Sequence, residues 1–145
     1  MDVKIKKLNP NAHFPTKGSD KAAGYDLYAC IEEAIEIQPQ KMVKIGTGIA
    51  VTPPEGYFGA IFARSGLATK RGLRPTNCVG VCDEDYTGEY IVGLYNDSNT
   101  IQTVDPGERI AQLIFLPYIN VNIIEVDELE ETERGDGGFG STGTL

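Results

Sequence analysis

The sequence predicts an all-β domain, a jelly-roll-like β-sandwich or barrel, followed by a flexible glycine-rich C-terminal tail. Three observations support this fold class. Short stretches of alternating or β-branched apolar residues recur along the chain, clusters of turn-forming residues separate them, and no window of roughly ten residues carries helical periodicity. The 17 glycines and 8 prolines in 145 residues favour many short strands over alternating strands and helices.

The strands can be assigned in chain order. Val3 and Ile5 alternate with lysines near the N-terminus, and a further strand is expected to begin within residues 23–29. The other predicted strands are residues 35–37, 42–51, 57–63, 90–94, 110–116 and 119–126. Proline, glycine, asparagine and aspartate, the residues that tight turns require, gather at residues 52–56, 96–99 and 105–107.

Two other local features lie between these strands. Residues 66–71 could form a short turn of helix. Residues 80–89 are bounded by glycines and dense in carboxylates, which predicts a hairpin or tight loop.

The length allows one ordinary domain with a buried core. We place the end of the compact body near Val126, because residues 127–133 are charged and nearly free of core-forming side chains. The predicted organisation is a β domain over residues 1–126 and a flexible tail over residues 127–145.

The tail carries Arg134, Phe139 and five glycines within residues 134–143. Glycines maximise backbone freedom, so such a segment becomes ordered only when it docks on something. A guanidinium suits phosphate oxygens, and a phenyl ring can stack on a flat ring. We interpret the segment as a lid, and a disordered tail without a role stays open as the alternative. The glycine spacing also matches a dinucleotide-binding fingerprint, but the strand and helix that this fingerprint needs are not predicted around it.

The formal net charge of −8 indicates an acidic surface, which in general repels nucleic acid and anionic membranes. A polyphosphate ligand would therefore need a few placed arginines and a divalent cation. No apolar run reaches membrane-spanning length, and the first residues lack the apolar run of a signal peptide. We expect no nucleic-acid partner and no membrane partner.

Three cysteines, an odd number, argue against a disulfide framework and for a reducing compartment, so a cytoplasmic location is expected. Cys78 and Cys82 are close in sequence, but Cys30 is remote and His13 is the only histidine, so no common zinc pattern can be assembled. With a single histidine, a serine or cysteine nucleophile would have only one possible histidine base. Carboxylates are the remaining candidates for a general base.

Four stretches carry chemically useful side chains. The acidic segment 80–89 lacks the spacing of a calcium loop and, taken alone, could be a solvated acidic turn. Arg64 and Ser65, where a strand is predicted to end, suit a phosphate. Gln112 lies on one face of a strand, as a hydrogen-bonding partner would, and Asp26 lies at a strand entry, where a capping role is common.

Taken together with the tail, these stretches resemble the five motifs of the trimeric deoxyuridine triphosphatase (dUTPase) family, and the resemblance covers nearly the whole chain. The motifs occur in order: Ala-Gly-x-Asp-Leu at 23–27, Arg-Ser-Gly-Leu-Ala at 64–68, Gly-Val-x-Asp-x-Asp-Tyr-x-Gly-Glu at 80–89, Gly-Glu-Arg-Ile-Ala-Gln at 107–112 and Arg-Gly-x-Gly-Gly-Phe-Gly-Ser-Thr-Gly at 134–143.

The resemblance implies a dUTP diphosphatase that releases dUMP and pyrophosphate by attack of water at the α-phosphate. Such an enzyme limits uracil incorporation into DNA and supplies dUMP for dTMP synthesis. It implies that Asp83 is the general base and that Gln112 holds the water or the α-phosphate. Mg²⁺ would be bound mainly through the triphosphate, with Asp26 near waters on the metal. A jelly-roll homotrimer is also implied, in which the tail of one subunit closes a site built by the other two.

The resemblance also implies the contacts of the substrate. In the body these are Arg64, Ser65 and Gly66 for the phosphates, Asn77, Gly80, Val81, Cys82 and Ile91 for uracil, and Tyr86 for the deoxyribose. In the tail they are Arg134 for the γ-phosphate, Phe139 for stacking on uracil, and Gly140, Ser141 and Thr142 for further phosphate contacts.

Two positions depart from the family pattern without removing a functional group. Ala63 stands where a proline is common, and Cys82 stands where an aliphatic residue is common. Because Cys82 is next to the implied base, we expect activity to be sensitive to oxidants. The competing interpretations are a deoxycytidine triphosphate deaminase, which shares the fold, and a non-catalytic nucleotide-sensing or protein-binding module. A regulatory protein partner also stays open.

Overall fold

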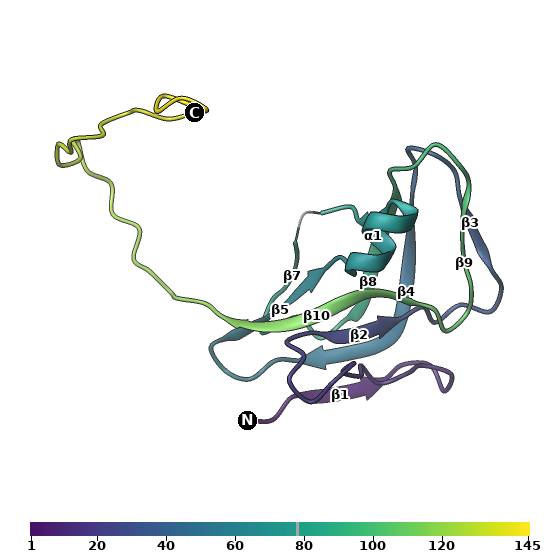
Figure 1. Ribbon diagram of the computed structural model, residues 1–145. Coiled ribbons are helices and arrows are strands. Elements are labelled where there is room, and N and C mark those ends of the chain that lie inside the picture. Colours follow the sequence, from purple (N-terminus) through teal and green to yellow (C-terminus); the bar gives the residue numbers. More distant parts are fainter. Residues whose placement is uncertain (78) are drawn as a thin grey trace.

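The computed structural model describes residues 1–77 and 79–145 (Figure 1). Cys78, considered above as a zinc ligand, lies outside the described residues. A small β body is followed by a long C-terminal arm. The elements are β1 (Lys4–Lys7), β2 (Tyr25–Tyr28), β3 (Ile35–Ile37), β4 (Met42–Thr52), β5 (Tyr57–Phe62), α1 (Ser65–Arg71), β6 (Leu73–Pro75), β7 (Gly80–Cys82), β8 (Glu89–Asn96), β9 (Gln102–Val104) and β10 (Arg109–Pro117).

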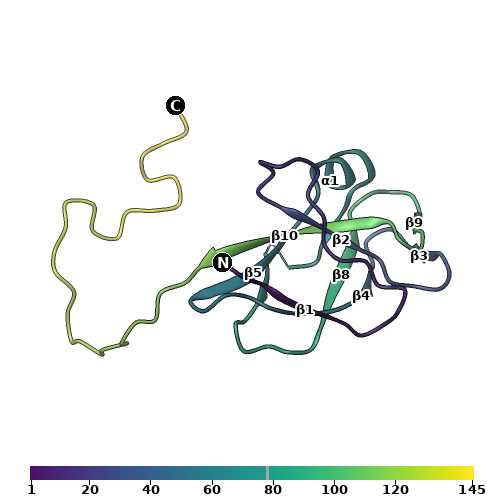
Figure 2. The same ribbon diagram turned by 90° about the horizontal axis from the view of Figure 1, so that it is seen from below.

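The strands form antiparallel sheets. Two sheets have four strands each, in the orders β1-β4-β8-β6 and β2-β10-β5-β7, and a third pairs β3 with β9. Neighbours within a sheet come from distant parts of the chain, as in a jelly roll, and Figure 2 shows β10 running beside β2 and β5. The predicted all-β fold class is confirmed.

The two four-stranded sheets share one apolar core. Along β8, Tyr90, Val92 and Leu94 are buried, whereas Ile91 between them is about half exposed. Leu113 from β10, in the other sheet, belongs to the same cluster of buried side chains. Every second side chain of a strand points to the same face, so β8 turns Tyr90, Val92 and Leu94 towards the core and Ile91 away from it.

β4 contains an irregularity between Gly46 and Ala50, where its register with β8 shifts. Gly48 there has φ of 70°, and an added Cβ would come within 2.8 Å of the Cys30 sulfur. Both the left-handed backbone and the close approach require glycine.

The predicted short helix is confirmed as α1. It ends at Gly72, whose φ of 65° is the left-handed conformation that commonly terminates helices. Lys70 and Arg71 occupy the last turn, where cations favour the helix dipole. No helix in the described part of the chain is both long enough and apolar enough to cross a membrane.

The strand predicted for residues 119–126 is wrong. β10 ends at Pro117, and the chain then leaves the body in both views (Figures 1 and 2). Ile119 and Ile123 are 85% and 93% exposed. A strand needs a partner edge, and this segment pairs with no strand of the chain that the structure describes. The body boundary near Val126 stays a prediction.

Candidate active site

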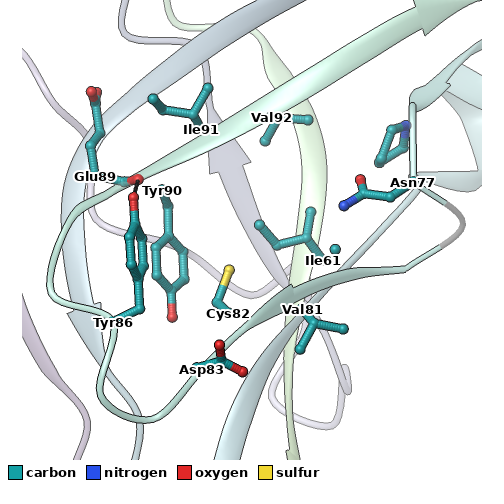
Figure 3. A pocket seen from close by; sticks show the side chains of 12 residues that line it. Ile61, Asn77, Val81, Cys82, Asp83, Tyr86, Glu89, Tyr90, Ile91 and Val92 are labelled. Atoms are coloured by element: carbon teal, nitrogen blue, oxygen red, sulfur yellow. Dashed lines mark hydrogen bonds between the residues drawn. The ribbon is translucent and has the colours of Figure 1, made fainter.

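A cavity of about 230 Å³ lies between β7 and β8, in the hairpin that the sequence analysis singled out (Figure 3). Asn77 lies at one end of this region and Tyr86 at the other. The cavity brings together many of the predicted site residues, namely Asn77, Gly80, Val81, Cys82, Asp83, Tyr86 and Ile91. Further lining residues are Ile61, Pro75, Glu89, Tyr90 and Val92.

Asp83 directly follows β7 and is exposed to solvent. Its backbone carbonyl accepts a hydrogen bond from the Tyr86 amide at 3.1 Å, which closes a tight turn. The carboxylate therefore combines access to water with a place on the cavity wall. A carboxylate placed this way can bind and deprotonate a water beside a ligand.

The Tyr86 ring forms another part of the cavity wall. Its hydroxyl donates to the Glu89 carbonyl at 2.9 Å, and its ring stacks on Tyr90 with centroids 6.4 Å apart. A Cβ added at Gly88 would lie 2.5 Å from the Tyr86 hydroxyl. The ring thus occupies the space that a side chain at Gly88 would need, and it is held flat against the hairpin.

Cys82 faces the cavity from β7. Burial raises the pKa of its thiol to about 11, and the negative charge of Asp83 acts in the same direction. A thiol with such a pKa is almost entirely protonated at neutral pH, and the protonated form reacts poorly with oxidants. The structure therefore gives no support to the oxidant sensitivity expected from the position of Cys82.

A second group of predicted residues lies around Asp26 on β2. The Arg64 Nε atom donates to Asp26 Oδ1 at 2.8 Å, and an Arg109 nitrogen lies 3.6 Å from Oδ2. The Asp26 side chain is 14% exposed. Two guanidinium groups thus hold this carboxylate. One of them belongs to Arg109, a residue that the sequence analysis did not select for the site.

Gln112 lies on β10 opposite Asp26 of β2 and Phe62 of β5. Its side-chain amide donates to the Ala63 carbonyl at 2.8 Å. A Cβ added at Gly24 would lie 2.2 Å from its Oε1 atom, so glycine is required there for this side chain to fit. Gln112 therefore belongs to the Asp26 group rather than to the cavity wall next to Asp83.

Ser65 and Gly66 begin α1, immediately after Arg64 in extended conformation. No side chain caps this helix end, and the space around the Gly66 α-carbon is open. The first amides of the helix are therefore available to an anion beside Arg64.

The tail residues do not reach the cavity. The Arg134 Nε atom donates to the Gly137 carbonyl at 2.6 Å, the Ser141 backbone amide donates to the Gly138 carbonyl at 3.1 Å, and Phe139 is fully exposed. Figure 1 shows the segment far along the arm from β7 and β8. Within one chain the structure does not bring Arg134, Phe139, Gly140, Ser141 and Thr142 together with Asp83.

Sequence reasoning also missed two neighbours of the site. Glu84, within the acidic segment 80–89, accepts hydrogen bonds from the Gly56 amide at 3.0 Å and from the Tyr118 hydroxyl. Tyr90 lines the cavity but was not selected. The alternation of β8, which puts Tyr90 on the inner face with Val92, was the signal that could have found it.

The described residues contain no group of three or more histidine, cysteine, aspartate or glutamate side chains that could hold a metal ion.

Comparison with known proteins gives one consistent result. The family model described as dUTPase matches residues 10–143. The deoxyuridine 5'-triphosphate nucleotidohydrolases of Nautilia profundicola and Hydrogenobaculum sp. (strain Y04AAS1) are 48% and 43% identical over 143 residues, covering 99% of each chain. The structure of the Staphylococcus bacteriophage 80alpha dUTPase with dUPNHPP superimposes with a TM-score of 0.88 and 30% identity, covering 99% of both chains.

Proposed function

Because the chain belongs to the dUTPase family, we infer that it hydrolyses dUTP to dUMP and pyrophosphate. The observation that carries this inference is the cavity between β7 and β8, whose lining includes the exposed Asp83, Asn77 and residues of the hairpin. The activity would limit uracil incorporation into DNA and supply dUMP for dTMP synthesis.

Uracil would be read mainly by backbone groups. Gly80, Val81, Cys82 and Ile91 line the cavity, and their backbone groups would face the base, whereas Asn77 would add its side-chain amide. Uracil presents an acceptor, a donor and an acceptor along its pairing edge. Cytosine exchanges donor and acceptor at two of these positions, so it would leave buried backbone groups without a hydrogen bond. The Tyr86 ring would pack under the deoxyribose and leave no room for a 2′-hydroxyl.

The chemical step would be in-line attack of water at the α-phosphate. Asp83 would orient and deprotonate the water, and Gln112 would hold the water or the α-phosphate. Arg64 with the amides of Ser65 and Gly66 would bind the phosphates and stabilise the leaving pyrophosphate, as preorganised donors do.

We propose that Mg²⁺ is bound mainly through the substrate's triphosphate. The residues fit this arrangement, because the Asp26 carboxylate is already held by Arg64 and Arg109 and would act through metal-bound water. When bound, Mg²⁺ neutralises charge on the phosphates.

A homotrimer is the proposed assembly. Within one chain, the residues around Asp26 and the tail residues do not line the cavity next to Asp83. The exposed Ile119, Val121 and Ile123 form an apolar stripe on the arm that a neighbouring subunit would cover. Light scattering should give three times the mass of one chain for the wild type, and a lower mass for the double variant Ile119→Asp, Ile123→Asp.

In such an assembly the tail would act as the lid. Fully extended, the residues between Pro117 and Arg134 span about 55–60 Å, which is enough to reach a neighbouring subunit. Arg134 would contact the γ-phosphate, Phe139 would stack on uracil, and Gly140, Ser141 and Thr142 would contact phosphates.

The proposed setting is the cytoplasm, with dUTP as ligand and without nucleic acid or membrane as partner. The net charge of −8 supports this, as do the free thiols of Cys30 and Cys82.

Incubation with Mg²⁺ and each of dUTP, UTP, dCTP and dTTP tests the function. We expect dUMP and pyrophosphate from dUTP alone, whereas ammonia release from dCTP would support a deaminase instead.

A further inference from the structure

The irregular part of β4 lies opposite the start of β8. The ladder between these strands pairs Gly46 with Ile91 and then Ala50 with Glu89. Residues 47–49 of β4 therefore form a bulge that stands opposite a single residue of β8. A bulge interrupts the ladder, so its backbone groups must find partners other than the opposite backbone.

The carboxylate of Glu89 is one of these partners. Its Oε1 atom accepts a hydrogen bond at 2.8 Å from the amide of Gly48, a buried residue of the bulge. A Cβ added at Gly46 would lie 2.6 Å from the same oxygen, so the glycine leaves the space that the carboxylate occupies. No lysine or arginine forms an ion pair with Glu89 within residues 1–77 and 79–145. The carboxylate thus serves the bulge as a hydrogen-bond acceptor.

The backbone of Glu89 holds the ring that is proposed to exclude a 2′-hydroxyl. The Tyr86 hydroxyl donates to the Glu89 carbonyl at 2.9 Å, and Figure 3 shows the Glu89 side chain pointing away from that ring. Because Tyr86 is 44% exposed, packing covers only part of its side chain, and the hydroxyl end depends on this bond. The position of the ring therefore follows the position at which β8 begins.

We propose that Glu89 is a positioning residue for sugar discrimination. Its carboxylate anchors the start of β8 to the β4 bulge, and its carbonyl then holds Tyr86 where a 2′-hydroxyl would clash. This inference rests on the proposed function and deepens it, because it gives the physical reason why a partly exposed ring stays in place beside the deoxyribose. The Glu89 side chain acts through Tyr86 and does not touch the substrate.

The ratio of kcat/KM for dUTP to kcat/KM for UTP tests the proposal. Glu89→Ala should lower this ratio by about three- to tenfold, the value of one hydrogen bond, because a released ring gives way to the 2′-hydroxyl. KM for dUTP should rise with kcat nearly unchanged, since the sugar contact is weakened equally in the ground and transition states. Glu89→Gln keeps an acceptor for the Gly48 amide and should retain the wild-type ratio.

Tyr86→Phe removes the hydrogen bond to the Glu89 carbonyl from its other end. It should lower the ratio by a similar factor, and the double variant Glu89→Ala, Tyr86→Phe should lower it no further. The matched control is Glu108→Ala, because Glu108 also accepts a backbone hydrogen bond, from the Asp105 amide at 2.9 Å, but does not line the cavity. Its ratio should equal that of the wild type even where its thermal midpoint falls, since destabilisation affects both substrates alike.

A wild-type ratio in folded Glu89→Ala overturns the proposal, and so does strict additivity of the two substitutions. If Glu89→Ala does not fold, Gly46→Ala crowds the same carboxylate without removing it, and an unchanged ratio in that variant overturns the proposal in the same way. Failure of the wild type itself to prefer dUTP over UTP would instead refute the proposed function of Tyr86.

Discussion

The guanidinium of Arg64 holds the carboxylate of Asp26, with Nε 2.8 Å from Oδ1, and so joins the residue before α1 to the middle of β2. Both side chains are largely buried, at 27% and 14% exposed. The contact fixes the proposed phosphate-binding arginine and the residue proposed to act through metal-bound water.

Asp26→Asn should weaken both stability and activity. Loss of the charge leaves Arg64 and Arg109 partly uncompensated, so the free energy of unfolding should fall by about 1–3 kcal/mol, and kcat/KM for dUTP should fall as well. Denaturant unfolding and steady-state kinetics measure the two effects. Asp97→Asn is the control, because its ion pair with Arg74 is long, at 3.7 Å, and exposed. Equal behaviour of the two variants would show that the Asp26 contact has no special role.

Glu84 and Tyr118 should act as a coupled pair. Glu84 joins the turn after Asp83 to the Gly56 amide and to the residue with which the arm begins. We expect Glu84→Gln and Tyr118→Phe each to lower kcat/KM several-fold by loosening the hairpin. In a double-mutant cycle on unfolding, the effects of the two substitutions should be less than additive. Strict additivity would mean that the contact does not stabilise the hairpin.

Cys82 should be slow to alkylate. With a thiol pKa of about 11, the thiolate fraction is small at pH 7 and grows about tenfold per pH unit up to that pKa. Peptide mapping after iodoacetamide treatment should therefore show Cys82 protected in the folded protein at pH 7 and modified increasingly at pH 8 and 9. Since folding raises this pKa, the associated stability is fully present below about pH 9 and is lost as the pH rises towards 11. Rapid labelling at pH 7 would contradict this account.

The sequence predicted the parts of the site that are local in the chain. Asn77, the hairpin residues and Asp83 are close in sequence, and the turn chemistry of 80–89 brings them together. Tyr90 was not selected, although the alternation of β8 puts it on the inner face. Its approach to Gly59 depends on how the two sheets pack together, which no local pattern encodes. The arm segment 119–126 was misread as a strand because its alternation is real, but it pairs with no strand in the described part of the chain and its apolar side chains are exposed. The pairing of Arg64 with Asp26 depends on sheet register and could not be read from either motif alone.

Removal of the tail should abolish most activity without unfolding the body. Residues 134–145 do not line the cavity within one chain, so truncation after Glu133 should leave the thermal midpoint within about 2 °C of the wild type. kcat/KM should fall by about 100-fold or more, because ligand contacts and water exclusion are lost together. Truncation after Gly143 is the control and should leave both kcat/KM and the thermal midpoint nearly unchanged. Full activity of the shorter protein would refute the lid.

The central claim is that Asp83 is the general base, and its most direct measurement compares Asp83→Asn with Asp85→Asn in the same hairpin. Both variants remove one negative charge and keep the side-chain shape, and only Asp83 lines the cavity beside Tyr86 and Tyr90. We predict that kcat for dUTP falls by about 100-fold or more in Asp83→Asn, with dUPNHPP still bound, and stays within a few-fold of the wild type in Asp85→Asn. Retention of wild-type kcat by Asp83→Asn, or an equal loss in both variants, would contradict the assignment.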